Sequence, residues 1–269
     1  MEECRYICRD GCWNPYHLYR AQNADSSKRM PCIVFLFGGG WMGGDMRQFA
    51  PQAERFAEEG ITAVTPFYRT FRENGNIVTS MQDVFSFLHH LDQVADELGI
   101  DRENIFLSGG SAGGHLAVSA VLFHHAKNNL HIKGLVLFNP VLDTSSKGYQ
   151  SLALTSQEWN PLLFSPLHYL YAVQNESVCL PPTIIFHGTS DTVMPYKRVR
   201  LFYEEVRRQK QKIFLLGYEG QQHGFFNQQK SKDNFCYFDT LDRSLAFCGD
   251  VLRNTLADSF CSLIGCSTQ

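Results

Sequence analysis

A serine flanked by glycines stands near the middle of the chain, in the run GGSAG at residues 109–113. The apolar residues 105–107 precede it, and the run HLAV at 115–118 favours a helix after it. The pattern G-x-S-x-G between a strand and a helix places a serine on a sharp, strained turn with its hydroxyl exposed. An ordinary glycine-rich turn would have the same composition. Ser111 is therefore a candidate nucleophile that needs partners elsewhere in the chain.

An acid and a histidine follow Ser111 in the order that one class of serine hydrolases uses. A serine hydroxyl is a poor nucleophile until a positioned base removes its proton. Asp191 follows the apolar run 183–187, and His223 follows the last apolar run, 212–216. Taken alone, Asp191 is also typical of a turn, and His223 is also typical of a surface loop. Together they predict Ser111 as nucleophile, His223 as base and Asp191 as its orienting acid, with Asp143 and Glu219 as alternative acids.

Three consecutive glycines, residues 38–40, follow another apolar run. Without side chains, their backbone N–H groups can point into a site. We expect Gly39, Gly40 and Ala112 to donate to a developing oxyanion, where losing one donor costs ~3 kcal/mol. The glycines match neither nucleotide-binding motif, G-x-x-x-x-G-K-[ST] nor G-x-G-x-x-G, so nucleotide binding is not predicted.

Composition excludes several other function classes. A net charge of −3 over 269 residues, with no long basic run, does not support nucleic-acid binding. The longest apolar runs are too short to span a membrane, and no signal peptide is visible. Nine scattered cysteines favour reduced thiols and a cytoplasmic protein; the alternative is a secreted chain with a trimmed leader. Cys4, Cys8 and Cys12 recur every fourth residue, but without a C-x-x-C spacing no metal is predicted.

Strands and helices alternate along the chain. The expected strands are 6–8, 16–19, 31–37, 61–65, the one before Ser111, 134–141, 183–187 and 212–216. The expected helices are 46–59 (capped by Asp45), 78–98, 112–127, 197–210 and 240–264. This alternation predicts an α/β fold of one domain, residues 1–269, with a mostly parallel central sheet and helices on both faces. Residues 143–181 break the rhythm and are expected to form a small cap-like insertion over the site.

Five motifs resemble those of the hormone-sensitive-lipase-like esterases, which have the α/β-hydrolase fold: GGGWMGG at 38–44, YR at 68–69, GGSAGGHLA at 109–117, HGTSDTVMP at 187–195 and EGQQHGFF at 219–226. The resemblance implies the same triad and oxyanion residues. Two features depart from the family pattern. Phe37 stands where the family usually has histidine. Only 37 residues precede the glycines, and from the resemblance we therefore expect a reduced N-terminal cap. The resulting open site would resemble that of compact microbial acetyl and feruloyl esterases.

These observations predict a serine carboxylesterase that hydrolyses short-acyl esters through an acyl-enzyme, with acetyl or feruloyl esters of carbohydrates as candidate substrates and without a cofactor or metal. The alternatives are an amide hydrolase, such as a small serine peptidase or formamidase, and a non-catalytic ligand-binding protein of the same fold. Candidate pocket residues, each equally compatible with the core, are Trp41, Trp159, Leu163, Phe164, His168, Phe225 and Phe226. Nothing in the sequence predicts an oligomeric state.

Overall fold

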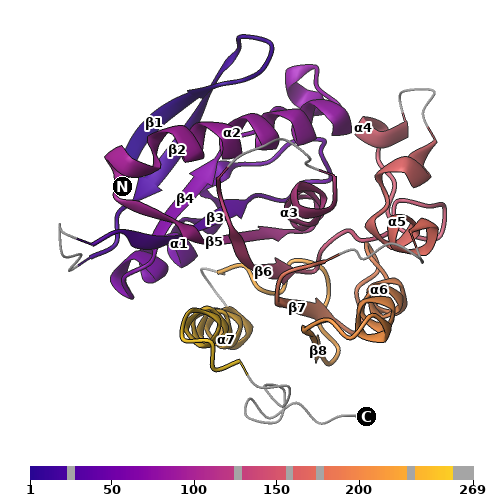
Figure 1. The fold of residues 1–269 in the computed structure, drawn as a ribbon. Helices are drawn as coiled ribbons and strands as arrows, with labels where there is room; N and C mark the ends of the chain where they lie inside the picture. Colours follow the sequence, from indigo (N-terminus) through magenta and orange to yellow (C-terminus); the bar gives the residue numbers. More distant parts are fainter. Residues whose placement is uncertain (23–27, 124–128, 156–159, 174–178, 229–233, 257–269) are drawn as a thin grey trace.

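The computed structural model describes residues 1–22, 28–123, 129–155, 160–173, 179–228 and 234–256. Its centre is a sheet in the strand order β1-β2-β4-β3-β5-β6-β7-β8 (Figure 1). The strands are β1 (Glu2–Ile7), β2 (Trp13–Tyr19), β3 (Met30–Leu36), β4 (Thr62–Pro66), β5 (Ile100–Gly110), β6 (Ile132–Phe138), β7 (Thr183–Gly188) and β8 (Ile213–Tyr218). Strand β2 pairs antiparallel with β1 and β4, and the neighbours from β4 to β8 pair in parallel. The predicted mostly parallel sheet is confirmed.

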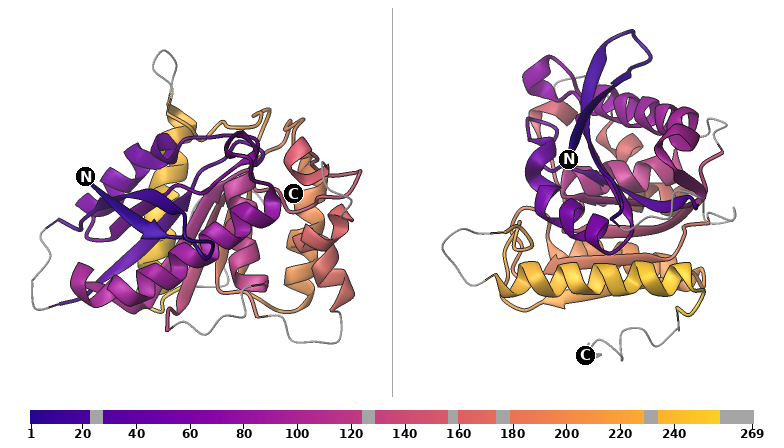
Figure 2. Two further views of the ribbon diagram at one scale, coloured as in Figure 1. Left: turned by 90° about the horizontal axis from the view of Figure 1, so that it is seen from above. Right: turned by 90° about the vertical axis from the view of Figure 1, so that its left-hand side faces the viewer.

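Helices cover both faces of the sheet, as the alternating pattern predicts. Helices α2 (Ile77–Leu98), α3 (Ala112–Leu122) and α6 (Tyr196–Arg208) contribute apolar side chains to one core cluster. Helices α1 (Ala50–Glu58) and α7 (Phe235–Leu252) contribute to a second cluster on the opposite face. Figure 2 shows α2 and α7 on opposite sides of the sheet. The parallel strands are buried on both faces, which explains their continuous apolar runs.

The closing helix differs most from its predicted bounds of 240–264. It begins at Phe235, because Tyr237 and Leu241 are buried at helical spacing and extend the apolar face one turn earlier. It ends at Leu252, and Asn254 beyond it has a φ of 56°. A left-handed residue just past the last turn is a common helix stop. Residues 257–264 of the predicted helix lie outside the described part of the chain.

The helix predicted at 46–59 consists of two pieces. A 3-10 turn, η1 (Met46–Phe49), precedes α1. The side chain of Asp45 accepts a hydrogen bond from the Arg47 N–H at 2.8 Å, so the predicted cap is confirmed at the start of η1. A proline in the first turn of α1 suits a new helix start, because its missing N–H has no intrahelical partner there.

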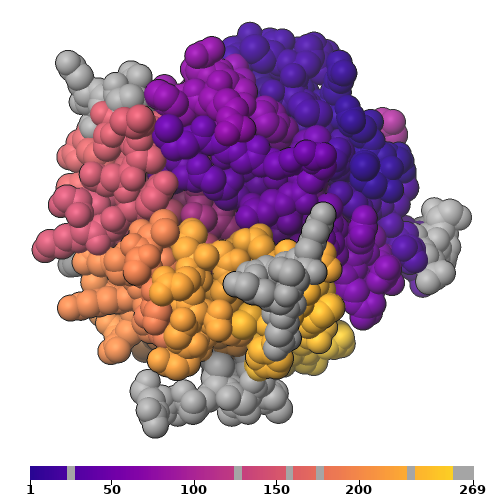
Figure 3. Space-filling model, turned by 180° about the vertical axis from the view of Figure 1, so that it is seen from behind, coloured from indigo at the N-terminus to yellow at the C-terminus, as the bar shows by residue number. Residues whose placement is uncertain are grey.

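Short helices make up the described part of residues 143–181: α4 (Leu152–Thr155), η3 (Pro161–Phe164) and α5 (Pro166–Ala172). Coloured pink in Figure 3, this part lies at one side of the molecule, next to both the N-terminal and the C-terminal halves. None of the helices in the described ranges is long and apolar enough to cross a membrane.

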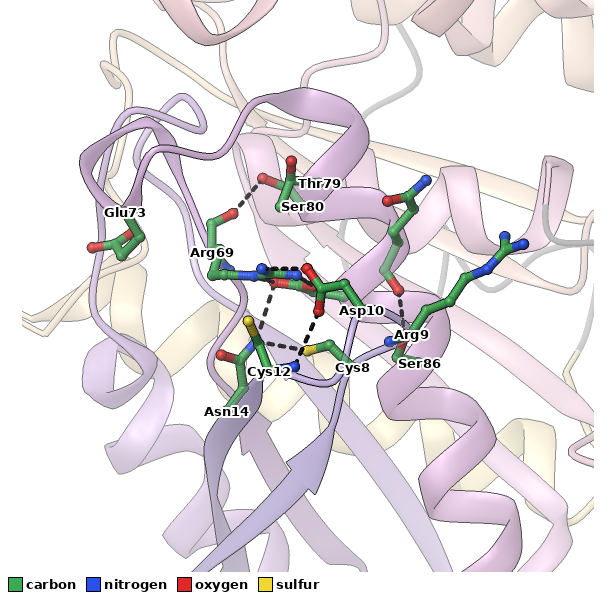
Figure 4. Close-up of polar contacts among 12 residues, drawn as sticks. Cys8, Arg9, Asp10, Cys12, Asn14, Arg69, Glu73, Thr79, Ser80 and Ser86 are labelled. Carbon is green, nitrogen blue, oxygen red and sulfur yellow. Dashed lines mark hydrogen bonds and ion pairs between the residues drawn. The ribbon is translucent and has the colours of Figure 1, made fainter.

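A polar cluster around Arg69 joins the N-terminal hairpin to the centre of the fold (Figure 4). The guanidinium of Arg69 forms two hydrogen bonds with Asp83, at 2.9 and 2.6 Å, and a third with Asp10 at 2.7 Å. Asn14 Nδ2 also donates to Asp83, at 3.1 Å. Beside Arg69, the Tyr68 hydroxyl donates to the Phe37 carbonyl at 2.6 Å, immediately before the glycine run. The cluster therefore supports the loop that carries Gly39 and Gly40.

Replacing Asp83 with alanine is expected to lower the free energy of unfolding by about 3 kcal/mol. The Asp83 side chain is almost fully buried, and its loss removes two hydrogen bonds from the Arg69 guanidinium, which keeps its bond to Asp10, and one from the Asn14 amide. Denaturant unfolding of Asp83→Ala and wild type measures the difference. The control is Glu2→Ala, which breaks the exposed pair with Arg20 and should change stability far less. Equal effects of both substitutions would contradict the structural role of Asp83.

Candidate active site

Ser111 lies on a strained turn between β5 and α3. Its φ and ψ are 53° and −115°, in a region that non-glycine residues rarely adopt. Backbone hydrogen bonds hold it there: its N–H donates to the Phe138 carbonyl at 2.9 Å, and its carbonyl accepts from the Val141 N–H at 3.0 Å. A Cβ on Gly113 would lie 2.0 Å from the Leu36 carbonyl oxygen, so only glycine lets α3 approach β3 this closely. The glycines around Ser111 thus follow from close backbone packing.

His223 bridges Ser111 and Asp191 through its two ring nitrogens. Its Nε2 lies 2.9 Å from the Ser111 hydroxyl oxygen, and its Nδ1 lies 2.7 Å from Asp191 Oδ2. Asp191 follows β7, His223 follows β8, and Ser111 follows β5, so all three lie at carboxyl ends of parallel strands. The structure therefore brings together the three residues that the sequence order had singled out.

The carboxylate of Asp191 is fully buried, accepts three hydrogen bonds and lies close to a second imidazole. Oδ2 accepts from His223 Nδ1 and also lies 3.2 Å from His187 Nε2. Oδ1 accepts from the backbone N–H groups of Val193 and Met194, each at 2.9 Å. Burial alone would raise the pKa of Asp191. The nearby imidazole of His187 and the hydrogen bonds from His223 and Met194 outweigh burial and hold this pKa well below its ordinary value. Asp191 is accordingly ionised at neutral pH and keeps a proton on Nδ1 of His223.

The glycine loop faces Ser111 across a small cavity. Gly39 and Gly40 have φ values of 130° and 63°, and an added Cβ would lie 2.0 Å from Gly43 O and from the Tyr149 hydroxyl, respectively. Within the described ranges, the backbone N–H groups of Gly39, Gly40 and Ala112 donate to no other residue. The N–H of Ala112 is also the first of helix α3, where the helix dipole favours negative charge. The loop and helix start can thus present donors to an oxyanion.

Phe37, the residue that departs from the family pattern, supports the glycine loop by aromatic packing. Its ring stacks on Tyr68 with centroids 4.0 Å apart and planes 3° apart, and it also stacks on Phe67. The Tyr68 hydroxyl in turn bonds the Phe37 carbonyl. The stacked Phe37 ring thus occupies the position where the resemblance leads us to expect a histidine side chain.

The cavity beside Ser111 has a volume of about 230 Å³. Apart from Ser111, His223 and the glycine loop, its lining includes Tyr149, Val193, Phe226 and three carboxamide residues, Gln48, Asn139 and Asn227. Phe226, one of the predicted pocket residues, packs between Phe49 and Phe138 and reaches this cavity.

The other predicted pocket residues in the described part of the chain do not line this cavity. Trp41 is fully buried, edge-on to His115, and Phe225 is buried against Tyr218. The remaining residues belong to the segment 143–181. Leu163 is exposed, the Phe164 carbonyl bonds His115, His168 lies against Ser165 and Asp143, and Trp159 is outside the described residues. Residue type alone could not separate pocket from core here.

Neither alternative acid forms an ion pair or hydrogen bond with His223 in the described part of the chain. Asp143 is buried and pairs with Arg198, with His168 3.5 Å away. Glu219 is exposed. Asp191 is therefore the acid that contacts the imidazole.

Two further histidines near the site, His115 and His187, are both buried. Burial lowers the pKa of His115 to about 4, against the opposing effect of its hydrogen bond to the Phe164 carbonyl. His187 Nε2 donates to the Met194 carbonyl at 2.8 Å beside Asp191. Gln48, Asn139 and Asn227 escaped the sequence analysis, because carboxamides carry no spacing signature and Gln48 and Asn227 are far apart in the chain.

Comparisons with known proteins agree with this geometry. A model of a family with the alpha/beta hydrolase fold matches residues 33–227. A probable isoprenylcysteine alpha-carbonyl methylesterase of Oryza sativa subsp. japonica is 30% identical over 74% of this chain and 53% of its own length. A probable carboxylic ester hydrolase of Mycobacterium tuberculosis is 26% identical over 79% of this chain and 53% of its own. The chain thus spans about half the length of these curated relatives.

Solved structures extend the likeness to nearly the whole chain. The apo form of esterase 2 of Thermogutta terrifontis has a TM-score of 0.81 and 35% sequence identity, covering 95% of this chain and 96% of that one. Its propionate-bound form has a TM-score of 0.80 and 34% identity, covering 95% of both chains. The sheet order, the strained serine turn and these matches together show that the chain belongs to the hormone-sensitive-lipase-like family of α/β hydrolases.

Proposed function

We propose that the protein is a serine carboxylesterase that hydrolyses short-acyl esters through an acyl-enzyme. The observation that carries the proposal is the continuous contact from Ser111 through His223 to Asp191, at 2.9 and 2.7 Å. It occurs beside a cavity into which the glycine loop opens. The relatives named above as esterases support the same reaction class.

In this mechanism the Ser111 hydroxyl attacks the ester carbonyl while His223 Nε2 takes its proton. The N–H groups of Gly39, Gly40 and Ala112 stabilise the oxyanion of the tetrahedral intermediate. His223 then passes the proton to the departing alcohol, which leaves Ser111 acylated. A water molecule repeats the sequence on the acyl-enzyme, releasing the acid and restoring the serine. Throughout, ionised Asp191 stabilises the imidazolium and holds its orientation.

A short acyl group is supported by the size of the cavity. Its 230 Å³ equals the volume of about eight water molecules at ~30 Å³ each, enough for a few carbon atoms. The Thermogutta terrifontis esterase 2 has been solved with propionate bound and with butyrate bound. The same esterase has been solved after phosphorylation by paraoxon, a reagent class that modifies nucleophilic serines.

The cap and the alcohol group are further parts of the proposal. We infer a single domain in which residues 143–181 cap the site: Tyr149 lines the cavity, and the Ser151 hydroxyl donates to the Gly40 carbonyl at 2.8 Å. A small cap of short helices leaves room for a bulky alcohol, as in acetyl or feruloyl esters of carbohydrates. The isoprenylcysteine methylesterase relatives suggest the opposite arrangement, a small alcohol on a large acyl group.

A chain-length series of p-nitrophenyl esters tests the proposed activity. We expect kcat/KM for the acetate, propionate and butyrate to exceed that for the decanoate at least about 10-fold, because ten carbons exceed the cavity volume. An acetylated sugar, a feruloylated sugar and an S-prenylcysteine methyl ester then identify the alcohol. Faster cleavage of a matched p-nitroanilide than of the ester would overturn esterase in favour of amide hydrolase. Absence of both turnover and fluorophosphonate labelling would indicate a non-catalytic protein.

A further inference from the structure

Three carboxamide side chains surround the Ser111 cavity, and none belongs to the proposed triad or oxyanion donors. Gln48 lies in η1 after the glycine loop, Asn139 follows β6, and Asn227 lies beyond His223. Asn139 is buried and the other two are half-buried, so these amides need hydrogen-bond partners within the protein.

Gln48 and Asn227 connect the glycine loop to the loop of His223. Gln48 Oε1 accepts from the Gly38 N–H at 2.6 Å, and Gln48 Nε2 donates to Asn227 Oδ1 at 3.1 Å. Asn227 Nδ2 donates to the Gly224 carbonyl at 2.9 Å. The chain starts at a backbone N–H and ends at a backbone carbonyl, so the orientations of both amides follow from it.

Asn139 holds the same glycine from its other side. Its Oδ1 accepts from the Gly224 N–H at 2.9 Å, which orients its Nδ2 toward His223 Nε2, 3.4 Å away. Asn139 is fully buried and has a φ of 32°, an unfavourable conformation for a residue with a side chain. Its own N–H donates to the Phe186 carbonyl at 2.7 Å, so strands β6 and β7 keep it in place.

We propose that Gln48, Asn227 and Asn139 form a carboxamide bridge that positions His223 relative to Ser111 and the glycine loop. The inference rests on the proposed function. The glycine loop follows β3 and the His223 loop follows β8, and three strands separate β3 from β8 in the sheet. Backbone pairing therefore cannot hold the two loops together. The bridge spans the two loops. The backbone of Gly224, next to His223, is held at both its N–H and its carbonyl.

The bridge also defines the hydrogen-bonding role of His223 Nε2. Asp191 keeps the proton on Nδ1, and the amide of Asn139 presents a donor to Nε2. A donor at that position disfavours the tautomer with a proton on Nε2, so Nε2 stays an acceptor for the Ser111 proton. Because a displacement of about 1 Å can reduce a rate about 100-fold, loosening the loop should reduce catalysis without removing any reacting group.

A double-mutant cycle tests the bridge. Wild type, Gln48→Ala, Asn139→Ala and the double variant are compared in kcat and KM for p-nitrophenyl acetate. We expect each single substitution to lower kcat about 10- to 100-fold and to change KM less than about 3-fold, because positioning acts on the transition state. The double variant should be only slightly slower than the slower single variant, since both act through Gly224 and His223. Thermal unfolding of all four proteins identifies any variant that fails to fold.

The matched control is Gln52→Ala, one turn along from Gln48. Gln52 is buried in α1, lies outside the lining of the Ser111 cavity, and its Oε1 has no partner within the described ranges. The Gln52→Ala substitution should leave kcat unchanged. If the wild type is active, two results would overturn the bridge alone. The first is an unchanged kcat in folded Gln48→Ala and Asn139→Ala. The second is a loss in the double variant equal to the product of the two single losses. Wild type that neither cleaves esters nor reacts with a fluorophosphonate would overturn the proposed function together with it.

Discussion

Replacing Ser111 with alanine is expected to reduce kcat for p-nitrophenyl acetate by about 10⁵- to 10⁶-fold. The substitution removes the Ser111 hydroxyl, which lies 2.9 Å from His223 Nε2, so no acyl-enzyme can form. The oxyanion donors and the cavity remain, which explains why a small residual rate over water should persist. Steady-state kinetics measure the loss. Mass spectrometry should show a fluorophosphonate adduct on Ser111 in the wild type and none in Ser111→Ala.

Ser108, three residues earlier on β5, provides a matched control. Its hydroxyl is buried and has no hydrogen-bond partner in the part of the chain that the structure describes. Ser108→Ala removes the same group from the strand that leads to Ser111, so it should retain activity within about 3-fold of the wild type. Full turnover by Ser111→Ala would exclude the acyl-enzyme mechanism.

Replacing Asp191 with asparagine is expected to lower kcat by about 10⁴-fold. All three hydrogen bonds that the structure shows for this carboxylate come from N–H groups: two from the backbone to Oδ1 and one from His223 to Oδ2. An asparagine must point its own N–H₂ either at the backbone donors or at the imidazole of His223. If it faces the imidazole, His223 adopts the tautomer with a proton on Nε2, which cannot accept the Ser111 proton. If it faces the backbone, the loop that carries residue 191 is disrupted.

The pH dependence of stability provides a second measurement on Asp191→Asn. Because the pKa of Asp191 is lowered on folding, its ionised form stabilises the fold at every pH above the unfolded value of ~3.9. This contribution disappears as the pH falls further, toward the folded pKa. The difference in unfolding free energy between wild type and Asp191→Asn should therefore be constant near neutral pH and shrink below about pH 4. A difference that grows in acid would contradict the depressed pKa.

Glu219→Gln is the control for this prediction. Glu219 is an acid close to His223 in the chain, but it is exposed. Its neutralisation should leave kcat within about 2-fold of the wild type. A loss comparable to that of Asp191→Asn would instead identify Glu219 as an essential acid.

The chemistry of the site and the class of fold could be predicted from the sequence because both follow from local rules. Glycines must flank Ser111, since a Cβ on Gly113 would overlap the backbone of the neighbouring strand. Asp191 and His223 each follow an apolar run that forms a parallel strand, and parallel strands bring their carboxyl ends to one edge of the sheet. Chain order and strand position therefore suffice to nominate the three residues, which the structure places in contact.

Only the tertiary structure could decide which side chains surround these residues. Trp41 and Phe226 are both aromatic, and both lie within motifs of the site. Trp41 is nevertheless buried in the core, whereas Phe226 lines the cavity. Gln48 and Asn227 meet across two loops from distant parts of the chain, and Asn139 meets them only through Gly224. A carboxamide bonds any suitable donor or acceptor, so its partner depends on the packing of whole elements. That packing is a property of the folded chain, and no spacing of residues encodes it.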